Sequence, residues 1–277
     1  MCVHRNVTRH RLVLAAAVAM TTLAAMACGS SSTSASTTPA ASTTASTGAV
    51  PQVSGSVTVF AAASLTESFT DLQTSLRAVQ PGLSLTYSFG GSGTLVTQIQ
   101  QGAPADVIAT ADTATMQKLT DGGLVEAPTT FARNKLEILV APGNPKAVNG
   151  LSDLGRSDLK VVLGDDTVPA GKYAAQALRV AGVATHPVSK EVDVKAAVAK
   201  VTSGEADATI VYVTDVNAAG AKGQGIDIPD AQNVTAEYPI AVVKGTKNHG
   251  AAAAFVDAVR GGAGQDALRR RGFVLGV

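Results

Sequence analysis

This sequence has few cysteine and histidine residues and a small net charge. Two of its 277 residues are cysteine, four are histidine, and 22 Lys and Arg residues nearly balance 21 Asp and Glu residues. A balanced chain supplies no basic field for nucleic acid, so we expect no DNA or RNA partner. After residue 28 the histidines are His186 and His249, neither in a recognisable catalytic pattern, so we do not expect an enzyme.

The first 28 residues have the pattern of a bacterial secretory signal. Three arginines lie before residue 12, and Leu12–Ala27 is an uncharged run of sixteen residues, shorter than the ~20 residues of a membrane span. The run ends with Ala27 before Cys28, which resembles the lipobox of bacterial lipoproteins, with Ala25 in place of the usual Leu. We expect lipidation at Cys28; the alternative is an uncleaved signal anchor. Cys2 would be removed with the leader, and no internal disulfide would then be possible.

A Ser/Thr-rich segment, residues 29–52, follows the signal. Thirteen of the nineteen residues from Ser30 to Gly48 are Ser or Thr, and the stretch has no charge and no large apolar side chain. Such a composition cannot build a core. We expect a flexible tether spanning about 25 Å, which would hold the folded part close to the outer face of a membrane.

Strand-like and helix-like segments alternate from residue 53 onward. Apolar residues recur at helical spacing in Leu65–Ala78 and in Val194–Thr202. The predicted strands are Val57–Ala61, Leu83–Phe89, Asp106–Thr110, Leu136–Ala141, Lys160–Gly164, Ala208–Val211 and Pro239–Val243. This alternation predicts an α/β fold with mostly parallel sheets flanked by helices.

Two stretches suggest where the chain passes between lobes. A turn rich in proline, Pro142–Pro145, follows one predicted strand, and residues 233–238 precede another. We therefore expect a first lobe of residues 53–135 and 244–277, a second lobe of residues 143–236, and hinge strands at 136–142 and 237–243. A two-lobed α/β protein offers the cleft between its lobes as the default binding site.

The residues that follow the predicted strands are small, apolar or hydroxylic. Ser64 and Glu67 have the spacing of a capping box, Gly90–Thr94 is a turn of small residues, and Pro169 suits a first helical turn. Helix starts expose unpaired N–H groups and a partial positive charge. Several of them facing one cleft bind an anion without any Lys, Arg or His. We expect a small, fully ionised anion that offers only acceptors.

Five segments together resemble a known family. They are Val59–Leu65, Gly102–Asp106, Val168–Gly171, Ile210–Tyr212 and Glu237–Val243. In this order, over about residues 55–275, they look like the molybdate-binding protein of bacterial molybdate ABC importers. The resemblance implies a type II periplasmic-binding fold that closes on molybdate or tungstate and a permease as its partner. It implies no cofactor and no directly ligated metal, and we expect a monomer.

The resemblance also implies which residues hold the anion. By motif they are Ser64, Ser92, Ala170, Val194 and Tyr212. The two serines would give hydroxyl and N–H groups, Ala170 and Val194 would give N–H groups only, and Tyr212 would give its phenol. Glycines flank Ser92 where the family commonly has further serines.

Other interpretations of these residues stay open. Ser64 could be a plain helix cap, and Tyr212 a core tyrosine. Sulfate or another tetrahedral oxyanion fits the same donors, so the residues alone do not choose molybdate. A ferric-ion site, a serine hydrolase and an adhesive lipoprotein are weaker alternatives. In the hydrolase case Thr94 stands where a nucleophile elbow requires Gly.

Overall fold

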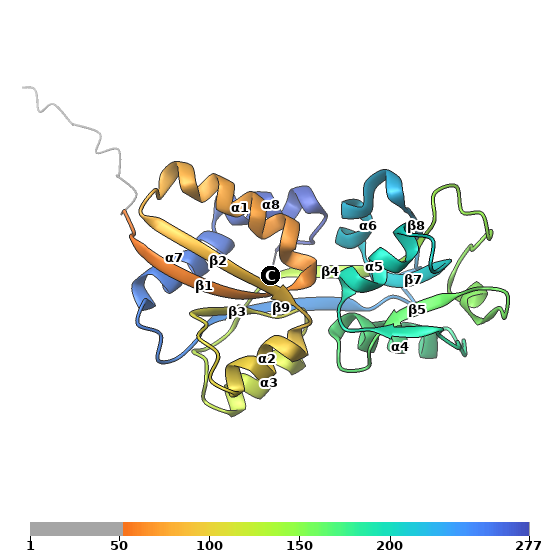
Figure 1. Ribbon diagram of the computed structural model, residues 1–277, viewed down its shortest axis with the longest axis horizontal. Coiled ribbons are helices and arrows are strands. Elements are labelled where there is room, and N and C mark those ends of the chain that lie inside the picture. Colours follow the sequence, from red (N-terminus) through yellow and green to blue (C-terminus); the bar gives the residue numbers. More distant parts are fainter. Residues whose placement is uncertain (1–51, 277) are drawn as a thin grey trace, which may run out of the picture. The chain divides into compact units, whose positions relative to one another are not determined.

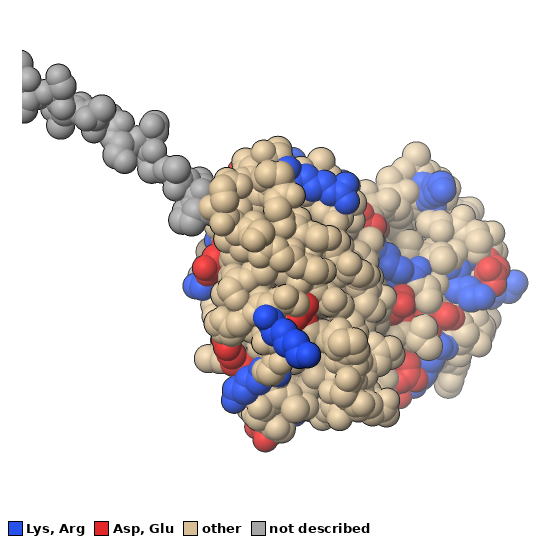
Figure 2. Space-filling view, turned by 60° about the vertical axis from the view of Figure 1, so that its left-hand side comes forward, with Lys and Arg blue, Asp and Glu red and all other residues tan. Residues whose placement is uncertain are grey.

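The computed structural model describes residues 52–276, drawn in colour in Figure 1. The predicted signal peptide, Cys28 and nearly all of the predicted tether lie outside these residues. Within the described part no helix has the length and apolar character needed to cross a membrane. On the face drawn in Figure 2, acidic and basic side chains are interspersed and form no field of one sign.

The described residues contain nine strands and eight α-helices. The strands are β1 (Gly55–Ala62), β2 (Leu83–Gly90), β3 (Val107–Ala109), β4 (Thr129–Val140), β5 (Val161–Gly164), β6 (Ser189–Glu191), β7 (Ala208–Tyr212), β8 (Gln224–Asp227) and β9 (Thr235–Val242). The helices are α1 (Thr66–Val79), α2 (Ser92–Gln100), α3 (Thr113–Asp121), α4 (Pro169–Val180), α5 (Val194–Thr202), α6 (Val213–Ala219), α7 (His249–Arg260) and α8 (Gly262–Arg271). The expected alternation of strands and helices is therefore confirmed.

The strands form two groups that β4 connects. In the first lobe the order is β2-β1-β3-β9-β4, and in the second it is β4-β7-β5-β6. Strands β2, β1 and β3 run parallel, as do β7, β5 and β6, whereas β9 and β4 run antiparallel to their neighbours. The predicted parallel pairing thus holds within each group, and the complete sheet is mixed. Figure 1 shows helices on both sides of the strands.

Strand β4 changes partners halfway along its length. Residues Thr129–Lys135 pair with β9, while Leu136–Val140 pair with β7 on one side and Glu137–Val140 with β8 on the other. Only this second half was predicted, because charged Arg133 and Lys135 and the buried Asn134 interrupt the apolar run of the first half. Likewise β9 begins four residues before its predicted start. The short polar strands β6 and β8 were missed.

Helix α5 has its predicted bounds, but the start of α1 differs from the prediction. A 3₁₀ turn, Ala63–Leu65, follows β1 directly, so α1 begins at Thr66 with Leu65 as its N-cap residue. No side chain caps this helix. The predicted capping box of Ser64 and Glu67 is therefore wrong, because the extra turn moves both side chains onto partners far along the chain.

Aromatic side chains fill the core beneath α1. The ring of Phe69 contacts Phe255 of α7 edge-on, with ring centroids 5.7 Å apart, and also lies beside Phe131 of β4. All three side chains are buried. Burying such a ring contributes about 1.5–3 kcal/mol. This packing fixes the position of the β1–α1 connection, which carries Ser64.

Gly171 in the first turn of α4 tests how closely this helix must approach β5. A methyl group there would lie 2.3 Å from the carbonyl oxygens of Gly164 and Asp165. We expect Gly171→Ala to lower the free energy of unfolding by about 1–3 kcal/mol, because the backbone must move to relieve the overlap. Urea denaturation measures the change.

Gly262→Ala is the matched control for this substitution. Gly262 is the first residue of α8 and has no neighbouring atom within 4 Å of the added methyl group. We expect a neutral or stabilising effect, because alanine favours helix by about 1 kcal/mol over glycine. Equal urea midpoints for Gly171→Ala and the wild type would show that α4 tolerates a wider approach.

Candidate functional site

All five residues singled out in the sequence line one small cavity between the lobes. The first lobe contributes Ser64 after β1 and Ser92 after β2, and the second contributes Ala170 after β5, Val194 after β6 and Tyr212 at the end of β7. The cavity volume is about 10 Å³, close to what one water molecule needs. The structure thus brings the five together at the carboxyl ends of parallel strands; their role as anion donors stays a prediction.

The starts of α2 and α4 at this cavity lack side-chain caps. Their N-cap residues, Gly91 and Val168, line the cavity, and neither has a side chain bonded to the first turn. Tyr212, the N-cap residue of α6, also lines the cavity, but its own N–H donates to Oδ2 of Asp215 at 3.3 Å. The first N–H groups of a helix have no partner inside the helix. They are therefore available to a ligand, together with the partial positive charge of each helix start.

Helix α5 differs because an acidic side chain caps it. Asp193 lines the cavity, and its Oδ1 atom accepts a hydrogen bond of 2.9 Å from the N–H of Ala196. This bond places the carboxylate on the helix rather than in the cavity centre. Within residues 52–276, no Lys, Arg or His side chain lines this cavity.

Ser92 is held by a bond from the neighbouring strand connection. Its Oγ atom accepts a hydrogen bond of 3.1 Å from the N–H of Ala111, which follows β3. Since the oxygen is already an acceptor, its hydroxyl hydrogen is free to point to a ligand. Ser92 is 1% exposed, so only the cavity can supply that ligand.

Tyr212 carries a buried hydroxyl group without a partner. Its oxygen lies close to the Tyr238 hydroxyl but makes no hydrogen bond of acceptable geometry with any residue of the described part. Burial raises the pKa of the Tyr212 phenol well above its ordinary value of 10, so it is a neutral donor. A buried hydroxyl group without a partner costs about 1–3 kcal/mol, and an acceptor in the cavity would remove this cost.

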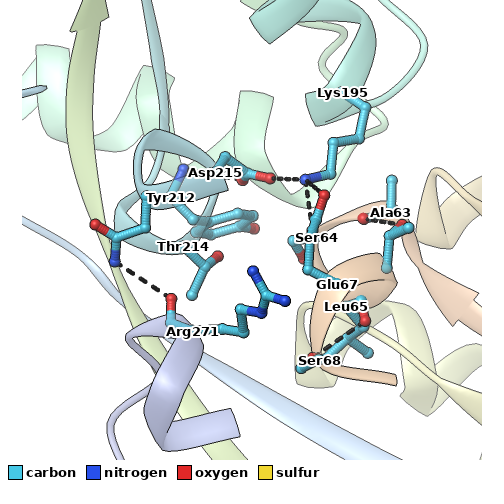
Figure 3. A network of polar contacts seen from close by, with 12 residues as sticks. Ala63, Ser64, Leu65, Glu67, Ser68, Lys195, Tyr212, Thr214, Asp215 and Arg271 are labelled. Atoms are coloured by element: carbon cyan, nitrogen blue, oxygen red, sulfur yellow. Dashed lines mark hydrogen bonds and ion pairs between the residues drawn. The ribbon is translucent and has the colours of Figure 1, made fainter. Parts of the chain in front are cut away.

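An ion network connects the lobes beside the cavity. In Figure 3 Lys195 of α5 lies between Glu67 of α1 and Asp215 of α6. Its Nζ atom is 2.8 Å from both carboxylate oxygens of Glu67 and 3.1 Å from Oδ1 of Asp215. No local pattern in the sequence indicated this contact, because Glu67 and Lys195 are 128 positions apart.

The described residues form no group of three or more His, Cys, Asp or Glu side chains placed to hold a metal ion. The residues that line the cavity offer hydroxyl and N–H donors from two lobes. Such donors bind and orient an acceptor, and no nucleophile paired with a base is present among the lining residues.

Comparison with known proteins identifies the family. Residues 57–274 match the family described as bacterial extracellular solute-binding protein. The chain belongs to this family. A solute-binding protein of Mycobacterium tuberculosis H37Rv, named molybdate-binding protein ModA, is 39% identical over 257 residues, covering 92% of this chain and 94% of that one. The resemblance seen in the sequence motifs is thereby confirmed.

Two solved structures of solute-binding proteins have the same fold. The periplasmic molybdate-binding protein of Azotobacter vinelandii aligns with a TM-score of 0.70 at 23% identity, covering 80% of this chain and 100% of that chain. The sulfate-binding protein SubI of M. tuberculosis aligns with a TM-score of 0.72 at 21% identity, covering 79% and 86%. The predicted two-lobed periplasmic-binding fold is confirmed, and these likenesses do not distinguish between the two anions.

The Gly91 position tests how closely the lobes of this solute-binding protein approach. A methyl group on Gly91 would lie 2.5 Å from the carbonyl oxygen of Val192 in the other lobe. We expect Gly91→Ala to cost the closed arrangement about 1–3 kcal/mol, which favours the open one by roughly 5- to 150-fold. Small-angle X-ray scattering should show a larger radius of gyration for this variant.

Gly90→Ala is the control, because its methyl group would meet only Leu95, at 3.8 Å. Superimposable scattering curves for both variants would contradict a tight approach.

Asp215 makes the stability of the protein depend on pH. Burial raises the pKa of this carboxyl group from 3.8 to about 6, while Lys195 opposes the rise and Glu67 adds to it. Between about pH 4 and pH 6 the Asp215 carboxyl group has lost its proton in the unfolded chain but keeps it in the folded chain. The contribution of Asp215 to stability therefore falls as the pH rises from 4 to 6. Asp215→Asn should therefore gain up to about 3 kcal/mol relative to the wild type over this window.

Urea denaturation at pH 4, 5, 6 and 7 measures this difference. Asp230→Asn is the control, because Asp230 is an exposed partner of Lys135 with a side chain 83% exposed. A difference between Asp215→Asn and the wild type that stays constant over the four pH values would show that Asp215 ionises normally.

Proposed function

We propose that this solute-binding protein captures molybdate, and also tungstate, in the cavity between its lobes and delivers it to an ABC importer. The observation that carries the proposal is the convergence of five uncharged donor residues from both lobes on one cavity with no cationic lining. Relatives named molybdate-binding protein ModA, from Mycobacterium tuberculosis and Escherichia coli, support the choice of anion.

Hydrogen bonds from neutral donors contribute enough free energy to replace the hydration of such an anion. Two serines offer hydroxyl and N–H groups, Ala170 and Val194 offer N–H groups, and Tyr212 offers its phenol, seven donors in all. Each hydrogen bond to a charged group contributes about 1.5–3 kcal/mol, so the sum exceeds about 10 kcal/mol before association and closure costs of several kcal/mol. A binding free energy of about −8 kcal/mol corresponds to a micromolar dissociation constant. We therefore expect micromolar binding or tighter.

The two lobes must close around the anion because the donors are divided between them. Ser64 and Ser92 belong to one lobe, and the other three donors belong to the second, so only the closed arrangement makes every bond. An anion enclosed by donors of both lobes cannot enter between closed lobes, so the lobes separate to admit it and close around it. The anion shifts the balance between open and closed forms, and a permease can sense that shift.

Selectivity among oxyanions depends on protons and size. Phosphate keeps a proton near neutral pH and needs an acceptor, whereas the Asp193 carboxylate is already bound to its own helix. Sulfate has the same charge and acceptors as molybdate, and backbone donors set for a larger anion would leave it with stretched bonds. Binding of sulfate or another tetrahedral oxyanion is the alternative function, and it fits the same donors.

The remaining parts of the proposal concern location and partners. We propose that Cys28 is lipidated after removal of the signal peptide and that the tether holds the protein outside the cell membrane, as suits an extracellular solute-binding family. The proposed partners are the permease and the small anion, without nucleic acid, cofactor or second copy. We propose binding without catalysis.

Ser64→Ala tests the function directly. We expect molybdate binding to weaken about tenfold or more, because a hydrogen bond worth about 1.5–3 kcal/mol is lost. Titration calorimetry measures the affinity. Ser68→Ala is the matched control, because Ser68 is equally buried on α1 but donates to the carbonyl oxygen of Leu65.

Competition calorimetry with tungstate, sulfate and phosphate completes the experiment. Tighter binding of molybdate and tungstate than of sulfate supports the proposal, and the reverse order supports the sulfate alternative. No binding of any oxyanion by the wild type would refute both. Equal affinities of the wild type and Ser64→Ala would remove Ser64 from the site.

A further inference from the structure

Ser64 touches a tyrosine that does not line the cavity. The Oγ atom of Ser64 and the hydroxyl oxygen of Tyr238 are 2.9 Å apart, although 174 positions separate the two residues. Tyr238 lies on β9, opposite Ala132 of β4. Both side chains of the pair are buried, Ser64 at 3% and Tyr238 at 0% exposure. Water therefore does not compete for this hydrogen bond.

The Tyr238 ring has a fixed position in the core. It packs edge-on against Phe273 and Tyr212, with ring centroids 5.2 Å and 5.8 Å away, and against Phe131 at 6.4 Å. A ring enclosed on these sides cannot swing to another rotamer without opening the core. The hydroxyl group at its tip is therefore held at one point in space.

The hydrogen bonds around Tyr238 can have only one direction when Ser64 binds an anion. Each hydroxyl group has one hydrogen to donate. If Ser64 donates its hydrogen to an oxyanion, its oxygen must accept from Tyr238. Burial raises the pKa of Tyr238 far above its ordinary value, so the phenol keeps the hydrogen that this requires.

Asn134 supports the same direction. It lies beside the Tyr238 hydroxyl. Its Oδ1 atom accepts from the N–H of Lys135 at 3.0 Å, and its Nδ2 atom donates to Thr214 at 2.9 Å. These bonds fix the amide and leave its second hydrogen as a donor to the Tyr238 oxygen. A chain of donors then runs from Asn134 through Tyr238 and Ser64 to the cavity.

We propose that Tyr238 is a positioning residue that holds the Ser64 hydroxyl group so that its hydrogen points into the cavity. This inference rests on the proposed oxyanion function. A serine hydroxyl group normally rotates among three staggered positions. The bond from Tyr238 selects one of them before the ligand arrives, so the anion meets an oriented donor instead of having to order one.

Tyr238→Phe tests the inference because it keeps the ring and removes only the hydroxyl group. We expect molybdate binding to weaken about three- to tenfold, less than in Ser64→Ala. In a Ser64→Ala background the same change should have less than about a twofold effect, because the group that Tyr238 orients is already gone. Titration calorimetry of the four proteins gives this coupling.

Tyr87→Phe is the matched control. The Tyr87 hydroxyl group donates to the carbonyl oxygen of Phe69 at 3.1 Å, away from the cavity-lining residues, so its loss removes a comparable bond. We expect wild-type affinity from this variant. Thermal melting of all variants, followed by circular dichroism, shows whether a loss of affinity follows a loss of stability.

The outcomes separate this inference from the proposed function. Wild-type affinity in Tyr238→Phe, with weakened binding in Ser64→Ala, overturns the positioning role and leaves the function standing. Equal losses from Tyr238→Phe in both backgrounds, or an equal loss in Tyr87→Phe, also overturn it, because they indicate a general structural effect. Absence of oxyanion binding in the wild type refutes the function itself.

Discussion

The unpaired N–H groups at the helix starts are the constraint on which the rest of the site depends. A charged ligand can leave water only where donors replace its hydration, and in the proposed site the backbone donors are the N–H groups of Ser64, Ser92, Ala170 and Val194 at the helix starts. An N-cap side chain facing the cavity would occupy such groups. The side chains of the N-cap residues Gly91 and Val168 make no cap hydrogen bond, so the starts of α2 and α4 keep their first N–H groups free at a cost in helix stability.

The ion network beside the cavity leaves the Lys195 ammonium group paired with two carboxylates. Lys195 follows directly after Val194, yet its ammonium group lies between the carboxylates of Glu67 and Asp215. A free ammonium group so close would attract any anion and would weaken discrimination by geometry. Pairing it with two carboxylates removes that attraction and, because Glu67 comes from the other lobe, adds a contact between the lobes. The field in the cavity is then set by oriented N–H and O–H groups.

Local sequence predicted the elements and the site residues better than it predicted the contacts among them. Apolar runs located β1, β5 and β7, and the family resemblance selected Ser64, Ala170 and Tyr212 near their ends as site residues. Capping-box spacing misled at Ser64, since a 3₁₀ turn intervenes and tertiary partners outcompete the local bond. The first half of β4 was missed because Arg133, Asn134 and Lys135 interrupt its apolar run, and its pairing with β9 joins segments about 100 positions apart. No local pattern encodes such pairings.

Rigidity at Ser64 completes the physical argument for selectivity by size. Backbone donors at a helix start cannot follow a smaller anion, because the helix is fixed by its packing on the sheet. Hydroxyl groups can rotate, so an unrestrained serine would adapt its hydrogen bond to sulfate as well as to molybdate. A bond from Tyr238, whose ring is enclosed by Phe131, Tyr212 and Phe273, gives the Ser64 hydroxyl group the same fixed direction as a backbone donor. Ser64 and the backbone donors then resist adjustment to a smaller anion, and the site discriminates between anions by their size.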